Sequence, residues 1–341
     1  MVTPVFNTAH IILGPTASGK SEAALHLAKH ANGVIICADA IQLFKGLPLL
    51  MAQPSKNDYS LAPHQLYGFF EPNAPLCSAA VFRKLALQAI QDAQRQNMTP
   101  LLVGGTGFYI KSLLHGLSDI PSVPDALMQQ LMRDETSALY AHLHEKDLTS
   151  AKRLNPFDRQ RVMRALSVIL ATGKPLSYWQ QKKRAKPTAN LTFKTTVINP
   201  PPDVLKVRIE KRCDLMFAQG LMDEIARFRD HFLQRLPPNK APALIHDKHA
   251  QQMKTSAIRT LLETQLGYST HWPAATRALG FYELLLALEG LISIKAAQAL
   301  VLQRTLQYAK RQRTWIRHQV TADHTFDSID ILKQQNLTNI I

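Results

Sequence analysis

Short apolar runs alternate with longer amphipathic stretches through the first third of the chain. Three runs of mostly aliphatic residues have the length and composition of strands, at residues 9–13, 33–38 and 100–105. Three other stretches repeat apolar residues at helical spacing, at residues 18–30, 78–96 and 106–116. The first follows the first run, and the other two lie before and after the third run. Continuous apolar strands separated by helices are typical of a parallel sheet covered on both faces, so the pattern predicts an α/β core.

The pattern changes after about residue 120. Residues 124–181 show only helical spacing, and residues 181–190 form a basic loop. Strand character then returns, followed by a helix with prolines at its start and, near the end of the chain, by a long helix, at residues 191–199, 201–220 and 292–318 respectively. Residues 232–270 are polar and lack a clear period, which favours a surface elaboration.

Composition excludes several classes of protein. The chain has 341 residues, of which 46% are hydrophobic and 19% charged, as in ordinary globular proteins. No apolar run approaches the roughly 18 to 20 residues of a membrane helix, and the N-terminal residues lack the pattern of a secretory signal. The three cysteines are far apart and form no C-x-x-C pair, so we expect neither a disulfide framework nor a structural zinc site. We therefore expect a cytoplasmic protein, and a monomer.

The charge is strongly positive and unevenly distributed. Lys and Arg number 40 against 25 Asp and Glu, a net charge of +15. Residues 151–186 hold ten basic residues and one acid, and residues 304–318 hold five basic residues and no acid. Such clusters favour a polyanionic partner such as nucleic acid. A solvated basic surface is the alternative.

Residues 14–21, Gly-Pro-Thr-Ala-Ser-Gly-Lys-Ser, match the phosphate-binding loop pattern G-x-x-x-x-G-K-[ST] between a predicted strand and a predicted helix. In such a loop the backbone amides and the helix N-terminus face phosphate oxygens. Lys20 would neutralise the outer phosphate, and the Ser21 hydroxyl would ligate Mg²⁺. The fold class predicted is therefore a P-loop NTPase-like α/β core with a parallel sheet and helices on both faces. It comprises residues 1–123 and 191–341, with an all-helical insertion at residues 124–190.

Two polar residues stand at the ends of predicted strands. Asp39 follows the second strand, and ligands of open parallel sheets lie beyond the carboxyl ends of the strands, so we expect it near the phosphate loop. A helix N-cap is the alternative role. The third strand ends in glycines and Thr106, where a nucleoside triphosphatase often carries a metal-holding Asp. A simple turn with Thr106 as the helix cap is the alternative there.

Basic residues also recur on predicted helices. Gln160, Arg161 and Arg164 fall on one side of a helix, where they could grip RNA phosphates and read base edges, or form a solvated face. Arg208 and Arg212 lie four residues apart on another helix, and they could clamp a diphosphate or pair with acids.

Several motifs together point to one family. They are, in order, "GPTASGKS", "ADAIQLF", "LLVGGTGFYIKSLLHGLSDIP", "NPFDRQRVMRAL", "TGKPLS", "RIEKRCDLMFAQGLMDEI", "RALGFYELLLALEG" and "YAKRQRTWIR". Their order and content resemble those of the tRNA dimethylallyltransferases, isopentenyl transferases that modify the adenosine beside the anticodon. The matches span residues 11–317, most of the chain.

The resemblance implies a reaction and a set of roles. Dimethylallyl diphosphate would donate a five-carbon group to N6 of the adenosine 3′ to the anticodon of tRNA, with Mg²⁺ assisting. Asp39 would be the general base on N6, Thr106 would sit at the reacting centre, and Lys20 would act on the leaving diphosphate. The residues implied to hold the diphosphate are Gly14, Pro15, Thr16, Ala17, Ser18, Gly19, Lys20, Ser21 and Arg212. Those implied to contact tRNA are Asp39, Ala40, Ile41, Gln42, Thr106, Gln160, Arg161, Val162, Met163, Arg164 and the segment from Arg277 to Tyr282.

The chain departs from the family pattern at two points near the expected site. Ala40 stands where the segment after the Asp usually has Ser, and Gln53 stands where a Lys is usual. Two other functions stay open on the residues alone. One is a P-loop small-molecule kinase that uses ATP, with Asp39 as its metal-holding carboxylate. The other is a tRNA-binding protein without catalysis.

Overall fold

The computed structural model describes residues 7–181, 191–234 and 244–335. The chain divides into two compact units, one of residues 1–110 with 190–341 and one of residues 111–189. The expected insertion began at residue 124, so the observed boundary lies earlier. Residues 111–115, which end α5 (Gly107–His115), and the connection after that helix group with the second unit.

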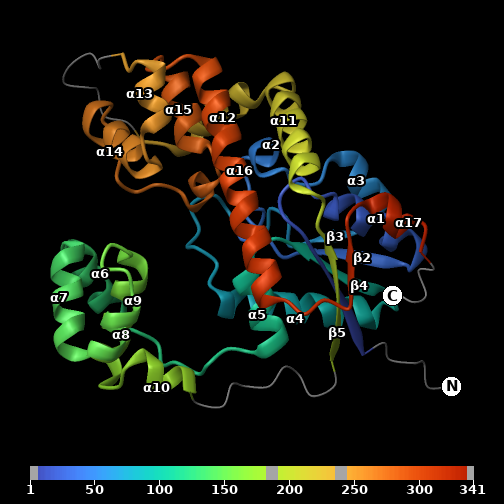
Figure 1. Cartoon of the computed structure of the whole chain (residues 1–341), viewed down its shortest axis with the longest axis horizontal. Helices are drawn as coiled ribbons and strands as arrows, with labels where there is room; N and C mark the ends of the chain where they lie inside the picture. The colour runs from blue at the N-terminus through green and yellow to red at the C-terminus, as the bar shows by residue number, and fades with distance from the viewer. Residues whose placement is uncertain (1–6, 182–190, 235–243, 336–341) are drawn as a thin grey trace. The chain divides into compact units, whose positions relative to one another are not determined.

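The first unit contains a six-stranded, fully parallel sheet in the order β3-β2-β4-β1-β5-β6 (Figure 1). Its strands are β1 Thr8–Leu13, β2 Gly33–Cys37, β3 His64–Gln65, β4 Thr99–Gly104, β5 Thr192–Ile198 and β6 His324–Phe326. The four strands that were predicted form the centre of this sheet. The two that were not, β3 and β6, are its short edges, and runs of two and three residues are too brief to show a period.

Helices cover both faces of the sheet, as predicted. Against one face lie α1 (Lys20–His30) and α17 (Ile329–Lys333), whose apolar residues join Ile12, Ile35 and Leu101 in one core, and α3 (Lys56–Leu61) packs against α1. Against β2 and β4 packs α4 (Ala79–Arg95), which Figure 1 shows on the opposite side of the sheet from α1.

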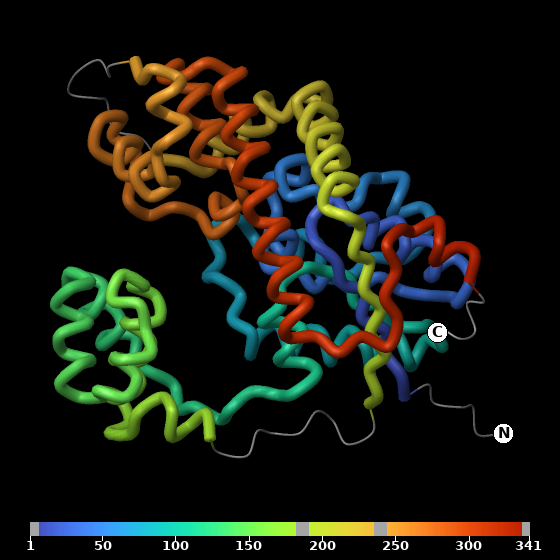
Figure 2. Tube along the Cα trace, in the orientation of Figure 1, coloured from blue at the N-terminus to red at the C-terminus, as the bar shows by residue number. Residues whose placement is uncertain are grey.

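A second group of helices stands beyond the sheet in the same unit. It contains α2 Pro48–Met51, α11 Pro202–Ala218, α12 Leu221–Phe232, α13 Asp247–Gln252, α14 Thr255–Gln265, η1 Ala274–Arg277, α15 Phe281–Leu288 and α16 Ile294–Gln319. The long helix α16 packs along α11 and α15, and Figure 2 traces it in red beside the yellow α11. Ser293 caps the start of α16 by accepting a hydrogen bond from the Ala296 amide.

The polar stretch 232–270 lacks a clear period and was expected to be a surface elaboration. Where it is described, it folds into α13 and α14, and Ala250, Ile258 and Leu262 are fully buried. Ile258 and Leu262 are four residues apart and share one helical face. Two apolar positions among many polar ones were too few to reveal the helix in the sequence.

The second unit is helical, as expected, and contains α6 Asp125–Arg133, α7 Thr136–Lys146, α8 Leu148–Arg153, α9 Arg159–Thr172 and α10 Leu176–Gln181. Its core includes Leu139, Leu143 and Leu166. Asp158 caps the start of α9 by accepting from the Arg161 amide, and Gly173, at a φ of 66°, ends it. Residues 182–190 of the predicted basic loop lie outside the described residues. No helix in the described ranges has the length and apolar character to cross a membrane.

Candidate active site

A cavity of about 540 Å³ lies where the ends of β1 and β2 meet α11 and α16. This position, beyond the carboxyl ends of parallel strands, is where open α/β sheets bind their ligands. Its walls carry Asp39, Gln42 and part of the set predicted to hold a diphosphate, and the members of that set that do not line it are Gly14, Pro15 and Ser18. Thr16, Ala17, Gly19, Lys20 and Ser21 all line it. The structure therefore brings both predicted halves of the site into one cavity.

The phosphate-binding loop joins β1 to α1 and has the tight backbone that its glycines allow. A Cβ atom on Gly14 would lie 2.3 Å from the Ser18 hydroxyl and 2.5 Å from the Ile198 carbonyl oxygen, so no larger residue fits there. Gly19 has a φ of 96°, in the left-handed region that favours glycine. Ser18 is fully buried against Gly14 and does not line the cavity, and its hydroxyl has no hydrogen-bond partner among the described residues.

Lys20 stands at the start of α1 and donates to the carbonyl oxygen of Pro15 at 3.3 Å. The pKa of Lys20 is lowered to about 8, chiefly by burial; the charge of Asp39 opposes the shift and that of Arg212 adds to it. An ammonium group with a weakened hold on its proton gains most from an anionic ligand. The site is thus electrostatically prepared for a phosphate.

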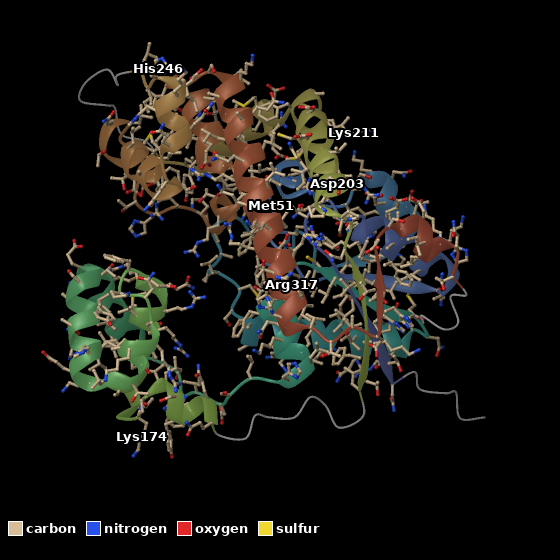
Figure 3. The ribbon with its side chains drawn as sticks, in the orientation of Figure 1. Met51, Lys174, Asp203, Lys211, His246 and Arg317 are labelled. Atoms are coloured by element: carbon tan, nitrogen blue, oxygen red, sulfur yellow. The ribbon has the colours of Figure 1, made fainter. Side chains whose placement is uncertain are left out.

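Both arginines of α11 reach the phosphate-binding loop. Arg212 donates to the Thr16 hydroxyl at 2.8 Å, and Arg208 donates to the Ser18 carbonyl oxygen at 3.0 Å. The spacing of the two arginines had suggested that both could clamp a diphosphate, and the family resemblance had singled out Arg212. The intervening Lys211 lies on the outer side of α11 (Figure 3). One helical face therefore brings two guanidinium groups to the loop.

Asp39 follows β2, and its Oδ1 atom accepts from the amides of Ile41 at 3.1 Å and Gln42 at 3.5 Å. These two bonds hold a turn, and no helix begins there, so Asp39 is not the helix N-cap of the alternative interpretation. The same side chain lines the cavity, and in the described part of the chain no hydrogen bond occupies Oδ2. One oxygen thus holds the turn, and the other remains for a ligand.

The glycines that end β4 are required by what packs behind them. A Cβ atom would lie 2.2 Å from the Ala38 carbonyl oxygen at Gly104, 2.2 Å from the Gln312 side chain at Gly105, and 2.4 Å from the Trp315 ring at Gly107. Close approach, and not a flexible turn, explains this glycine-rich segment. Thr106 directly precedes α5 (Gly107–His115), and its carbonyl oxygen accepts from the amides of Tyr109 at 3.0 Å and Ile110 at 3.3 Å. Its hydroxyl also accepts from the Ala40 amide at 2.9 Å, which ties the β4 end to the Asp39 segment.

Two residues of α16 were missed from the sequence. Gln312, only 6% exposed, accepts from the Thr16 amide at 2.8 Å and donates to the Gly105 carbonyl oxygen at 3.3 Å. Tyr308 lines the cavity one turn earlier, and burial raises the pKa of its phenol, as does the nearby charge of Asp39. The cavity-lining residues of this helix recur at helical spacing, at Val301, Thr305, Tyr308 and Gln312, but the sequence alone does not mark this face of the helix as the one that meets a ligand.

The sequence and fold were compared with those of known proteins. A family model described as IPP transferase matches residues 42–319, and one described as isopentenyl transferase matches residues 7–60. A protein named tRNA dimethylallyltransferase from Rhodospirillum centenum is 38% identical over 97% of this chain and 95% of its own length. One of the same name from Zymomonas mobilis is 36% identical over 95% of this chain and 92% of its own. The chain belongs to the IPP transferase family.

Solved structures agree with this assignment. A tRNA isopentenylpyrophosphate transferase from Staphylococcus epidermidis is 27% identical, with a TM-score of 0.57 over 96% of each chain. A eukaryotic dimethylallyltransferase solved while acting on tRNA has a TM-score of 0.70 over 91% of this chain and 69% of its own, and at 22% identity it supports the fold alone.

Family membership also focuses attention on the residues expected to contact tRNA. In the helical unit, Gln160, Arg161 and Arg164 are exposed on α9, and Arg161 pairs with Asp158. Val162 is fully buried in the core of that unit, and Met163 packs against the same core. The inclusion of Val162 was therefore wrong for its side chain, which serves packing.

A similar division holds in the segment from residue 277 to 282. Arg277 is exposed and lines the cavity. Phe281 is fully buried, and Tyr282 is buried with its hydroxyl 3.1 Å from that of Thr276. Both side chains pack inside the unit in this structure, unlike Arg277, so the expectation of RNA contacts at the end of that segment is not matched by exposed side chains.

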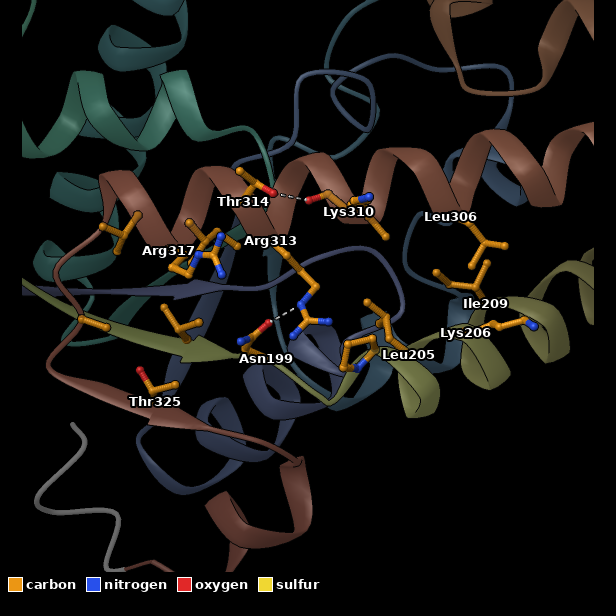
Figure 4. Close-up of a pocket in the computed structure, with 16 residues that line it drawn as sticks. Asn199, Leu205, Lys206, Ile209, Leu306, Lys310, Arg313, Thr314, Arg317 and Thr325 are labelled. Carbon is orange, nitrogen blue, oxygen red and sulfur yellow. Dashed lines mark hydrogen bonds between the residues drawn. The ribbon is translucent and has the colours of Figure 1, made fainter.

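A second cavity, of about 670 Å³, lies between β5, α11 and α16 in this member of the family (Figure 4). Arg313 reaches across it and donates to the Asn199 side chain at 3.1 Å. Its floor is apolar, its rim carries Lys206, Lys310 and Arg317, and its described lining includes no carboxylate. Without a group that can accept a proton from an amine, it does not match the chemistry of an N6 transfer, although it is the larger cavity.

Proposed function

We propose that this chain catalyses the transfer of a dimethylallyl group from dimethylallyl diphosphate to N6 of the adenosine 3′ to the anticodon of tRNA. The observation that carries the proposal is the single cavity in which a phosphate-binding loop with two arginines faces Asp39 and Gln42. The names of the relatives do not favour the kinase alternative. We expect the enzyme to act in the cytoplasm as a monomer.

The residues present can supply each part of that reaction. The diphosphate would lie against the loop amides, Lys20, Arg208 and Arg212, which stabilise the negative charge that develops as it leaves. A bond forms between N6 and C1 of the donor while the bond from C1 to the diphosphate oxygen breaks. Asp39 would take the proton that N6 loses as this bond forms. The adenine N6 lone pair is delocalised into the ring, so proton removal during bond formation contributes about 10²- to 10⁴-fold.

Magnesium fits the donor set of this site. Mg²⁺ prefers oxygen ligands and commonly binds through one or two protein groups plus substrate phosphates. The Ser21 hydroxyl and the Asp39 carboxylate line the same cavity. Among the described residues, no group of three or more His, Cys, Asp or Glu side chains is arranged to hold a metal ion. We propose that Ser21 holds the ion, whose chemistry is to neutralise the diphosphate.

The tRNA would be held by residues that read single-stranded bases and phosphates. Asp39 to Gln42, Thr106 and Arg277 would face the target adenosine, which must leave its stack at a cost of a few kcal/mol. An anticodon loop is already partly unstacked, which reduces that cost. Gln160, Arg161 and Arg164, exposed on α9, would contact the RNA backbone.

The direct test is incubation of the purified protein with radiolabelled dimethylallyl diphosphate, Mg²⁺ and unmodified tRNA, followed by nucleoside analysis. Label in N6-dimethylallyl adenosine beside the anticodon is the expected result. No label in RNA, together with phosphate transfer from ATP to a small molecule, would overturn the proposal in favour of the kinase. Specific tRNA binding without either reaction would leave a non-catalytic binding protein.

A further inference from the structure

One wall of the candidate active site is formed by a short helix that has little intrinsic stability. Residues Leu50, Met51 and Ala52, from α2 and the residue after it, line the cavity (Figure 3 labels Met51). This helix has four residues. Ala52, the residue that caps its C-terminus, has a φ of 52°, which is unfavourable for a residue with a Cβ atom. A single turn of helix does not persist without outside support. Something else in the molecule must hold this wall.

Glu224 of α12 provides that support. Its two carboxylate oxygens accept from the amides of Leu49 at 2.8 Å and Leu50 at 3.0 Å, in the first turn of α2. The side chain is 4% exposed and does not line the cavity. Burial raises the pKa of Glu224, and the two amide bonds oppose the shift. A buried carboxylate at this helix N-terminus satisfies two amides that no helix carbonyl can reach.

The C-terminal end of α2 is hydrogen-bonded to Gln42. The Gln42 side chain donates to the Met51 carbonyl oxygen at 2.9 Å, and Gln53 donates to the carbonyl oxygens of Gln42 at 2.8 Å and Phe44 at 2.7 Å. Gln53 also lies outside the cavity lining. Glu224 and Gln53 thus brace the strip from residue 42 to residue 53 from outside. The phosphate-binding loop has no hydrogen bond to either side chain in the described structure.

We propose that Glu224 and Gln53 are positioning residues that set the acceptor side of the active site, the side that receives the target adenosine. They act through α2 and Gln42, and they do not affect the part of the cavity formed by the phosphate-binding loop. The inference rests on the proposed function, because it assigns this wall to the acceptor of that reaction.

The test separates acceptor from donor kinetics in Glu224→Gln. The amide retains one acceptor oxygen but turns an N–H group toward a buried backbone N–H, and an unsatisfied buried donor costs enough to displace α2. We expect the KM for tRNA to rise about tenfold or more, with the KM for dimethylallyl diphosphate within about twofold of the wild type. Asp223→Asn is the matched control, since it removes an exposed carboxylate from the same first turn of α12. It should leave both constants near the wild-type values.

A purely structural role for Glu224 predicts a different result. Loss of folded enzyme would lower kcat and leave both KM values unchanged. Equal losses for tRNA and donor, or no loss for tRNA, would overturn the proposal. If Glu224→Gln does not fold, Gln53→Leu tests the same wall without a buried charge and should show the same split. In contrast to Gln53→Leu, Gln53→Lys should keep the tRNA kinetics of the wild type, because an ammonium group can donate to both carbonyl oxygens. Wild-type turnover is measured alongside, so failure of the proposed function would be seen separately.

Discussion

At the scale of single residues, Asp39 combines a structural and a chemical role in one carboxylate. Oδ1 holds the turn through the Ile41 amide, and the side chain also faces the cavity. Asparagine at this position keeps an oxygen for the turn and removes the base. We therefore expect Asp39→Asn to lower kcat by about 10²- to 10⁴-fold while tRNA affinity stays close to the wild-type value.

Single-turnover rates and filter binding measure the two effects on the same preparation. Glu22→Gln is the control, because Glu22 is the other carboxylate that lines the cavity and is exposed at the start of α1. It should change neither. A parallel collapse of tRNA binding in Asp39→Asn would make Asp39 a binding or structural residue.

Lys20 gives a pH dependence whose sign follows from its surroundings. Burial lowers its pKa to about 8, so the side chain is charged below that pH and increasingly neutral above it. A neutral Lys20 attracts the diphosphate less. We expect kcat/KM for dimethylallyl diphosphate to be flat up to about pH 8 and to fall above it, since this constant reports the free enzyme. In Lys20→Arg the side chain keeps its charge above pH 8, so the fall in kcat/KM should disappear. A fall that persists in this variant would show that another group titrates.

The sequence was most informative where local spacing determines the local structure. Residues 14–21 could be assigned from eight positions because their glycines and Lys20 act within one loop. Gln312 could not, because its partner Thr16 lies 296 residues away. Glu224 was missed for the same reason, as its contact with Leu49 spans 175 residues.

At the scale of elements, α16 was predicted within two residues of its observed start, but its function was not. The helix closes the cavity because the β4 end has no side chain at Gly105, where Gln312 fits against the backbone. A methyl group there would lie 2.2 Å from the Gln312 amide. We expect Gly105→Ala to lower the free energy of unfolding by about 1–3 kcal/mol, the usual cost of overpacking.

A double-mutant cycle identifies the cause of that loss. In the Gln312→Ala background the clash is absent, so Gly105→Ala should cost much less there than in the wild type. Chemical denaturation of the four proteins gives the required free energies. An equal cost in both backgrounds would locate the strain elsewhere.

At the scale of the whole molecule, the proposed roles are divided between two units. The donor cavity is built entirely from the first unit, and Gln160, Arg161 and Arg164 belong to the second. The net charge of +15 gave a reason to expect a polyanion but did not indicate which cations would be exposed. Arg159 shows why, because it donates to the carbonyl oxygens of Asp134 and Met132 and so serves the fold of its own unit.

This division predicts that donor binding and RNA binding can be lost independently. In Arg161→Ala/Arg164→Ala, the slope of log affinity for tRNA against log salt should fall by about 1.4 to 1.8, since each phosphate contact contributes about 0.7 to 0.9. The rise in Tm caused by inorganic diphosphate with Mg²⁺ should remain, because a ligand stabilises only the site that binds it. Lys20→Met should show the reverse, with the diphosphate effect lost and the salt slope kept. Lys84→Ala/Arg95→Ala, which removes two exposed cations from α4, controls for net charge and should leave both properties unchanged. If that control flattens the salt slope as much as the α9 pair does, the RNA responds to total charge, and α9 is not a specific contact surface.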